Sequence, residues 1–160
     1  MKAFLKAFIY AFHGIIAATK TQRNFRIHII MMIYVTSFSF FYNLSNIEYM
    51  ILILTFAMVV SLELVNTALE NVVDLCSPEY NKLAKTGKDC AAGAVLIAAI
   101  GAVIIGIFIF ADIDTIKMIL NFYCNNYIAL AGLIISVAVS VLFICCPFAK
   151  MKGKNNEYKN

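Results

Sequence analysis

The sequence predicts an all-α membrane protein, because its composition and the lengths of its apolar segments both depart from those of a soluble domain. Of the 160 residues, 62% are hydrophobic and 14% are charged, against about half and about a quarter in soluble domains. Four apolar segments cover about 27–44, 49–70, 91–111 and 127–147, and each is near the ~20 residues that a helix needs to cross a bilayer core. We therefore expect an N-terminal amphipathic surface helix followed by four transmembrane helices.

The basic residues between these segments predict how the chain crosses the membrane, because lysine and arginine mark cytoplasmic loops. They cluster before the first segment, between the second and third, and after the fourth, at Lys2, Lys6, Lys20, Arg23, Arg26, Lys82, Lys85, Lys88, Lys150, Lys152, Lys154 and Lys159. The links near 43–48 and 112–126 hold a single basic residue, Lys117. Both termini are therefore predicted to be cytoplasmic, and the polar, basic tail over 150–160 is predicted to be disordered.

The first 20 residues are predicted to form a helix on the membrane surface. At helical spacing, four apolar side chains share one side and four basic ones share the other, namely Phe4, Phe8, Phe12 and Ile15 against Lys2, Lys6, His13 and Lys20. Such a helix lies in the interface with its basic side toward anionic headgroups. The alternative is a signal peptide cleaved near IAATK, which N-terminal sequencing of the mature protein would detect.

The second apolar segment carries the candidate site. Its polar residues fall on one helix face at about 100° per residue, and they are Glu63, Asn66, Glu70 and Asp74. A carboxylate inside a bilayer is costly, so an intramembrane acid predicts a functional site. The alternative is a structural role in hydrogen bonds between helices, or a proton or ion path.

The link after this segment is predicted to bring further charges beside the first set. Ser77 and Pro78 suit the N-cap and first position of a helix that runs into the third segment. Antiparallel packing through this short link would gather three acids and a lysine at the cytoplasmic boundary, namely Glu70, Asp74, Lys88 and Asp89. Carboxylates hold Mg²⁺ and lysine binds phosphate as a point charge, so the pattern indicates a metal–phosphate site.

Glu63 is predicted to lie deeper in the membrane than the rest of this site. It precedes Glu70 by seven residues, which is about 10 Å along a helix. Water is scarce at that depth, so the carboxylate is suited to accept a proton from the hydroxyl of a membrane lipid alcohol, with Asn66 one turn away in support. Substrates or another subunit must bridge this distance. A chain of this length encloses no large cavity, and we therefore expect a sizeable site to form between subunits.

These residues belong to two stretches that resemble a known family. ELVNTALENVVD (63–74) followed by PEYNKLAKTGKDCAAGAVLI (78–97) is similar to the prokaryotic diacylglycerol kinase family. The family motif reads roughly E-x-x-N-[ST]-A-x-E-x-x-x-D, then A-K-D-x-x-[AS]-A-A-V. With GIIAATKTQRNFRIH (14–28) the resemblance covers about residues 1–110.

The resemblance implies a small homotrimeric lipid kinase that transfers the γ-phosphate of ATP to a lipid hydroxyl with Mg²⁺. Its active sites would lie between subunits at the cytoplasmic face of a bacterial cell membrane. It implies Glu63 as the base with Asn66 in support, and Glu70 and Asp74 at the metal. It implies ATP or phosphate contacts at Tyr10, Glu79, Tyr80, Asn81, Lys88 and Asp89. The expected partners are ATP, a lipid alcohol, the membrane and further copies of the chain, and not nucleic acid.

One position departs from the family pattern. Where the family usually has a second metal-binding glutamate before the first span, this chain has Gln22. An amide oxygen can ligate a hard cation but supplies no charge. We therefore keep Gln22 as a third candidate metal ligand and expect either a lower affinity for Mg²⁺ or the substitution of a neighbouring acid.

The resemblance leaves the acceptor open between diacylglycerol and undecaprenol. The stretch RNFRIH (23–28) is more similar to the undecaprenol kinases, and the Ile-, Asn- and Lys-rich composition is compatible with that group. We therefore favour undecaprenol.

The predicted organisation has three parts, namely a lipid kinase core over 1–111 that holds three of the spans, an additional transmembrane helix over 112–149, and the tail. Two other functions stay open. One is a small transporter that uses the acids as an ion or proton relay. The other is a catalytically weakened family member in which Gln22 and the extra span serve assembly.

Overall fold

The computed structural model describes residues 2–146, and every regular element in this range is an α-helix. The helices are α1 (Lys2–Thr21), α2 (Arg23–Ser39), α3 (Asn46–Cys76), α4 (Lys82–Phe110), α5 (Ile113–Asn125) and α6 (Tyr127–Cys145). The all-α prediction is confirmed. The predicted tail over 150–160 lies outside the described residues.

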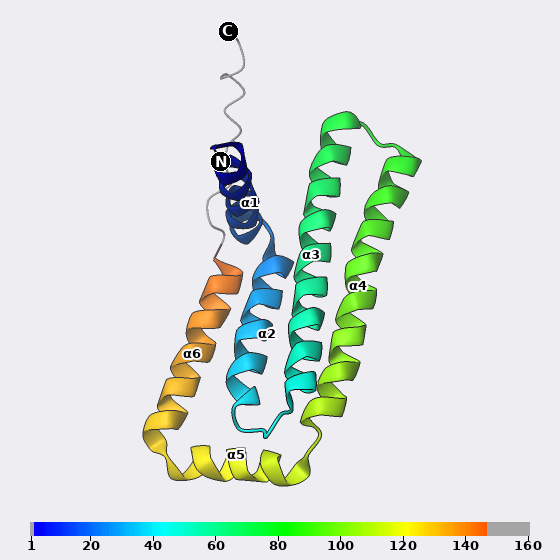
Figure 1. The fold of residues 1–160 in the computed structure, drawn as a ribbon. Coiled ribbons are helices and arrows are strands. Elements are labelled where there is room, and N and C mark those ends of the chain that lie inside the picture. The colour runs from blue at the N-terminus through cyan, green and yellow to red at the C-terminus, as the bar shows by residue number, and fades with distance from the viewer. Residues whose placement is uncertain (1, 147–160) are drawn as a thin grey trace.

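Four helices stand side by side in the order α6, α2, α3, α4 (Figure 1). The long helices α3 and α4 run antiparallel and form the most extensive helix contact of the described chain. Helix α1 is seen nearly end-on beside one end of α2, and α5 crosses the opposite end of the molecule from α4 to α6 (Figure 1). The chain therefore returns beneath α3 and α2 before α6 packs on the far side of α2.

Three helices in the described range are long and apolar enough to cross a membrane, namely α3, α4 and α6. The first predicted span, 27–44, corresponds to α2, which is not among them. Helix α2 has 17 residues, or about 26 Å, and the hydrocarbon core is about 30 Å thick. It begins with Arg23 and also contains Arg26, and the chain turns soon after Ser39. The structure thus supports three of the four predicted spans.

Helix α3 is longer than its apolar segment. Its N-terminus is a capping box, in which the backbone N–H of Glu48 donates to the Ser45 hydroxyl at 3.3 Å and the backbone N–H of Ser45 donates to the Glu48 carboxylate at 2.7 Å. The segment predicted over 49–70 continues as helix through its polar end to Cys76. This extension carries the charged part of the polar face out to the link.

The prediction that Ser77 caps the next helix is wrong. Ser77 is the C-cap of α3, and Asn81 caps α4. The side-chain oxygen of Asn81 accepts the backbone N–H groups of Leu83 at 2.8 Å and Ala84 at 3.2 Å. Because this oxygen satisfies two of the N–H groups that a helix start leaves free, it defines where α4 begins. The link between the two helices is residues 77–81.

The predicted link over 112–126 contains the helix α5. Asp112 caps it, and one face is a polar stripe of Asp114, Lys117, Asn121 and Asn125. The other side packs by aromatic contacts onto the end of α2, with ring centroids 5.7 Å apart for Phe41 and Phe122 and 6.4 Å apart for Phe38 and Tyr123. The helical spacing of these polar residues is the feature of the sequence from which α5 could have been predicted.

Helix α6 is held to α2 by polar contacts between two otherwise apolar surfaces. The Tyr34 hydroxyl lies 3.0 Å from the Ser136 hydroxyl and 3.2 Å from that of Ser140. At the other end, the buried guanidinium of Arg26 donates to the backbone oxygen of Cys146 at 3.0 Å. These contacts fix α6 in register along α2.

We expect Tyr34→Phe to weaken the packing of α6 on α2, because it removes the hydroxyl that both serines contact. Hydrogen bonds between membrane helices contribute roughly 0.6 to 1.7 kcal/mol, and the free energy of unfolding in detergent micelles should fall by an amount in this range. Tyr127→Phe is the control, since Tyr127 is 81% exposed at the start of α6. Equal stability of the two variants would contradict the proposed contact.

Candidate functional site

The deep part of the polar face on α3 is buried within the protein. Glu63, Asn66 and Thr67 are 2%, 7% and 8% exposed. The Thr67 hydroxyl donates to the backbone oxygen of Glu63 at 2.9 Å, and the Asn66 amide donates to the Glu70 carboxylate at 3.2 Å. The Asn66 side-chain oxygen is buried without a hydrogen-bond partner among the described residues. Buried polar atoms of this kind call for an explanation, and a ligand hydroxyl would supply one.

The outer part of the face opens into a cleft of about 300 Å³ between the end of α3 and the start of α4. Six of the residues singled out from the sequence line it, namely Asp74, Glu79, Tyr80, Asn81, Lys88 and Asp89. The Lys88 ammonium lies 2.8 Å from the Asp74 carboxylate, with side chains 33% and 68% exposed. The antiparallel α3–α4 pair thus brings Asp74, Lys88 and Asp89 together, while Glu70, the fourth residue of the predicted cluster, does not line the cleft.

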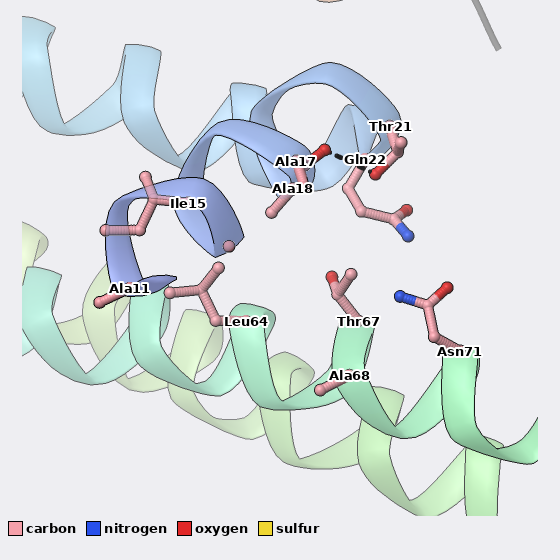
Figure 2. A pocket seen from close by; sticks show the side chains of 11 residues that line it. Ala11, Ile15, Ala17, Ala18, Thr21, Gln22, Leu64, Thr67, Ala68 and Asn71 are labelled. Carbon is pink, nitrogen blue, oxygen red and sulfur yellow. Dashed lines mark hydrogen bonds between the residues drawn. The ribbon is translucent and has the colours of Figure 1, made fainter. Parts of the chain in front are cut away.

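Gln22 lies in a different cavity. It occupies the junction of α1 and α2 in an extended conformation and lines a space of about 630 Å³ between α1 and α3. Figure 2 shows its side chain reaching toward Thr67 and Asn71 of α3. Glu70 and Asp74 do not line this cavity, so the structure does not gather the three candidate metal ligands around one space.

The sequence analysis did not single out Asn71. It predicted a nucleotide contact at Tyr10, which lines neither of the two cavities described above. Asn71 follows Glu70 directly and faces α1 across the cavity of Gln22 (Figure 2); its position on the α1-facing side of α3 needed knowledge of where α1 packs. Tyr10 is 69% exposed on α1 and lines neither cavity.

Two neighbouring acids on α3 match the number of carboxylates that a magnesium ion usually takes from a protein. No three histidine, cysteine or acidic side chains within residues 2–146 gather closely enough to hold a metal. Glu70 and Asp74 lie one helical turn apart on α3 and present two carboxylates. Mg²⁺ usually takes one or two carboxylates and completes its octahedron with water and phosphate oxygens. The residues present therefore fit this ion.

The chain is similar to proteins that are named as kinases. The family described as prokaryotic diacylglycerol kinase matches residues 9–110. A diacylglycerol kinase of Synechocystis sp. is 52% identical over 103 residues, which are 64% of this chain and 59% of that protein. An undecaprenol kinase of Bacillus subtilis is 43% identical over 110 residues, or 69% of this chain and 89% of that protein. A diacylglycerol kinase of Escherichia coli is 33% identical over 100 residues, covering 62% and 82% respectively.

The chain is all-helical, and its membrane helix α3 carries acids beside a cleft that Lys88 lines. Together with these relatives, this arrangement places the chain in the class of membrane lipid kinases. The chain belongs to the prokaryotic diacylglycerol kinase family. The match ends at residue 110, so α5 and α6 lie beyond it. No solved structure matches the chain significantly.

We expect the Lys88–Asp74 pair to contribute little to stability, because exposed ion pairs contribute at most about 1 kcal/mol. Lys88→Met and Asp74→Asn, singly and combined, should give a coupling energy below that value when unfolding is measured in detergent. Lys117→Met with Asp114→Asn is a matched exposed pair on α5, 3.6 Å apart. A coupling several times larger for the first pair would assign it a structural role.

Proposed function

We propose that this protein transfers the γ-phosphate of ATP to the hydroxyl of a membrane lipid alcohol, with Mg²⁺, at the cytoplasmic face of the bacterial cell membrane. One observation carries the proposal. A single face of α3 joins a buried carboxylate, Glu63, to an open cleft that contains Lys88. A lipid alcohol can approach Glu63 from the membrane, and a charged nucleotide can approach the cleft from water. An ion relay would need the buried acid but not the cleft.

The side chains divide the chemistry of phosphoryl transfer between them. Glu63 accepts the proton of the lipid hydroxyl, and Asn66 positions the reacting groups through its free side-chain oxygen. Lys88 neutralises charge on the transferred phosphoryl group, since this reaction depends chiefly on placement and electrostatics. Of the other cleft residues, Glu79, Tyr80 and Asp89 are available to the nucleotide, while the Asn81 side chain also caps α4.

Glu70 and Asp74 would hold Mg²⁺, which would neutralise the phosphate oxygens of ATP when bound. Gln22 is the third candidate ligand, and it would have to turn out of the cavity that it shares with Asn71 to reach these acids. Tyr10 would contact the nucleotide only if α1 bends over the cleft or a neighbouring copy supplies it.

The placement of the chain in the membrane is part of the proposal. We place α1 on the inner surface, where its exposed Phe4, Phe8 and Phe12 enter the bilayer. We place α2 as a fourth membrane helix, shielded between α6 and α3, and both termini in the cytoplasm. A homotrimer would supply the surface that closes the site, because one copy leaves about 10 Å along α3 between Glu63 and the metal-binding acids.

The acceptor that we propose is undecaprenol, with diacylglycerol as the alternative. The Bacillus relative, whose length the match covers almost completely, is named for the first lipid. The Synechocystis relative, more similar over a shorter share of its length, is named for the second. The two lipids assayed side by side with labelled ATP decide between them.

We expect Glu63→Gln to reduce lipid phosphorylation at least about 100-fold, because the amide cannot accept the proton and general base catalysis typically contributes that much or more. Transfer of labelled phosphate from ATP to either lipid measures the effect. Glu48→Gln is the matched control at the other end of α3, since glutamine preserves the capping box. Retention of most of the activity by Glu63→Gln would contradict its role as the base.

We expect Gln22→Glu to lower the Mg²⁺ concentration required for half-maximal activity. A carboxylate at position 22 would add a negative charge to the metal site, whereas the amide of Gln22 offers only a neutral oxygen. Asn24→Asp is the control, because it adds the same charge at an exposed position two residues away. An unchanged Mg²⁺ dependence in Gln22→Glu would place residue 22 outside the metal site.

A further inference from the structure

Helix α5 carries apolar side chains that the fold leaves exposed. Ile113, Ile116 and Leu120 recur at helical spacing and are 65%, 40% and 61% exposed. They lie beside the polar stripe and are distinct from Phe122 and Tyr123, which pack onto the end of α2. Helix α5 therefore has one side against the bundle, one polar side and one exposed apolar side.

Both ends of α5 are held at the level where membrane helices end. Residues 111–112 join it to α4 and Asn126 joins it to α6, and both of these helices are long and apolar enough to cross a membrane. Helix α6 has 19 residues, or about 28 Å, against a hydrocarbon core of about 30 Å. Its first residue, Tyr127, therefore lies close to the membrane boundary, and so does the end of α5 at Asn125.

Tyrosines gather at the end of the bundle that α5 crosses. Four of them belong to segments that meet there (Figure 1), namely Tyr42, Tyr49, Tyr123 and Tyr127. The Tyr42 hydroxyl donates to the backbone oxygen of Phe110 at 3.1 Å, while Tyr127 is 81% exposed. Tyrosine is enriched where membranes meet water, because its ring is apolar and its hydroxyl is polar. This end of the bundle therefore has the composition of a membrane boundary.

We propose that α5 lies along the membrane surface opposite the cleft of Lys88, with its exposed apolar side among the lipid acyl chains and its polar stripe in water. A helix with one polar and one apolar side takes this position at a bilayer. The inference concerns a helix beyond the family match and does not depend on the proposed kinase activity.

The partner that fits this side of α5 is a lipid surface of any headgroup charge. Asp114 and Lys117 form an ion pair 3.6 Å apart, and the other two members of the polar stripe are neutral, so the stripe carries no net charge. Helix α1, in contrast, carries basic residues and no acid. Helix α5 therefore gains from the burial of apolar surface and not from attraction to anionic headgroups.

A bilayer is favoured over a second copy of the chain as the occupant. The exposed apolar side is continuous at both ends with helices that a bilayer surrounds. The position also accounts for the short helix α2, whose 17 residues do not reach across the hydrocarbon core. Phe122 and Tyr123 cover its end at Phe38 and Phe41, so a surface-lying α5 keeps water from the end of α2.

The test uses tryptophan, because the chain has none and a single introduced tryptophan reports only its own position. Leu120→Trp and Asn121→Trp are a matched pair. Both residues are exposed in the isolated chain, and they lie about 100° apart around α5. Ile116→Trp and Lys117→Trp repeat the comparison about one turn earlier, which covers the case in which a variant of the first pair does not fold.

The full chain is placed in phosphatidylcholine nanodiscs, whose two faces are both open to solution. We expect Leu120→Trp to emit at a shorter wavelength than Asn121→Trp. Brominated acyl chains should quench it severalfold more strongly, and acrylamide in the water should quench it severalfold less. Addition of phosphatidylglycerol should leave these differences unchanged, because the stripe has no net charge.

Three results would overturn the inference. One is equal quenching of the two tryptophans by acrylamide. Another is a Leu120→Trp fluorescence that neither quencher reduces, which would assign this side of α5 to contact with a second copy. The third is a difference that appears only with phosphatidylglycerol, which would reject a lipid surface of any charge. No measurement here uses ATP or a lipid acceptor, so failure of the proposed kinase function would leave the result unaffected.

Discussion

The antiparallel contact between α3 and α4 is the interaction on which the candidate site depends. Helix α3 carries acids at several depths, but acids on a single membrane helix cost free energy and do not by themselves form a site. The short link at 77–81 returns the chain immediately, and the Asn81 cap starts α4 beside the end of α3. This places Lys88 against Asp74. Without that return, Asp74 would lose its contact with Lys88 and the cleft between α3 and α4 would not exist.

Depth along α3 separates the environments of the two ends of the site. Glu63 is sealed from solvent, while the Asp74 side chain is two-thirds exposed. A carboxylate in a dry environment is suited to take up a proton, and one in contact with water is suited to remain charged beside a metal and phosphates. One helix can therefore meet a lipid and a nucleotide at once, because it crosses from one solvent into the other.

The part of the chain beyond the family match packs against α2, which is not among the three helices of the described range that are long and apolar enough to cross a membrane. Helix α2 is short and carries Arg23 and Arg26 in its first turn, so it is poorly suited to face lipid on all sides. Helix α6 covers one of its sides through Tyr34, and the carbonyl at the end of α6 accepts from Arg26. Helix α5 makes this possible, because it carries the chain across the end of the bundle to the far side of α2.

By itself, the sequence determined the helical class, the polar face of α3 and the family, because these follow from composition, from the 3.6-residue period and from a dense motif. The period also places Glu63 and Asp74 on one side of α3 without any knowledge of packing. Only the tertiary structure decided that Gln22 faces Asn71 and not Glu70, because the direction of α1 at its junction with α2 has no local signal. The structure likewise decided that α4 starts at Asn81, whose side chain satisfies two free backbone N–H groups, and that the aromatic side of α5 packs onto the end of α2. The apolar groove that includes Val59 and Val60 lies between the three consecutive helices α2, α3 and α4, and it exists only because they pack together.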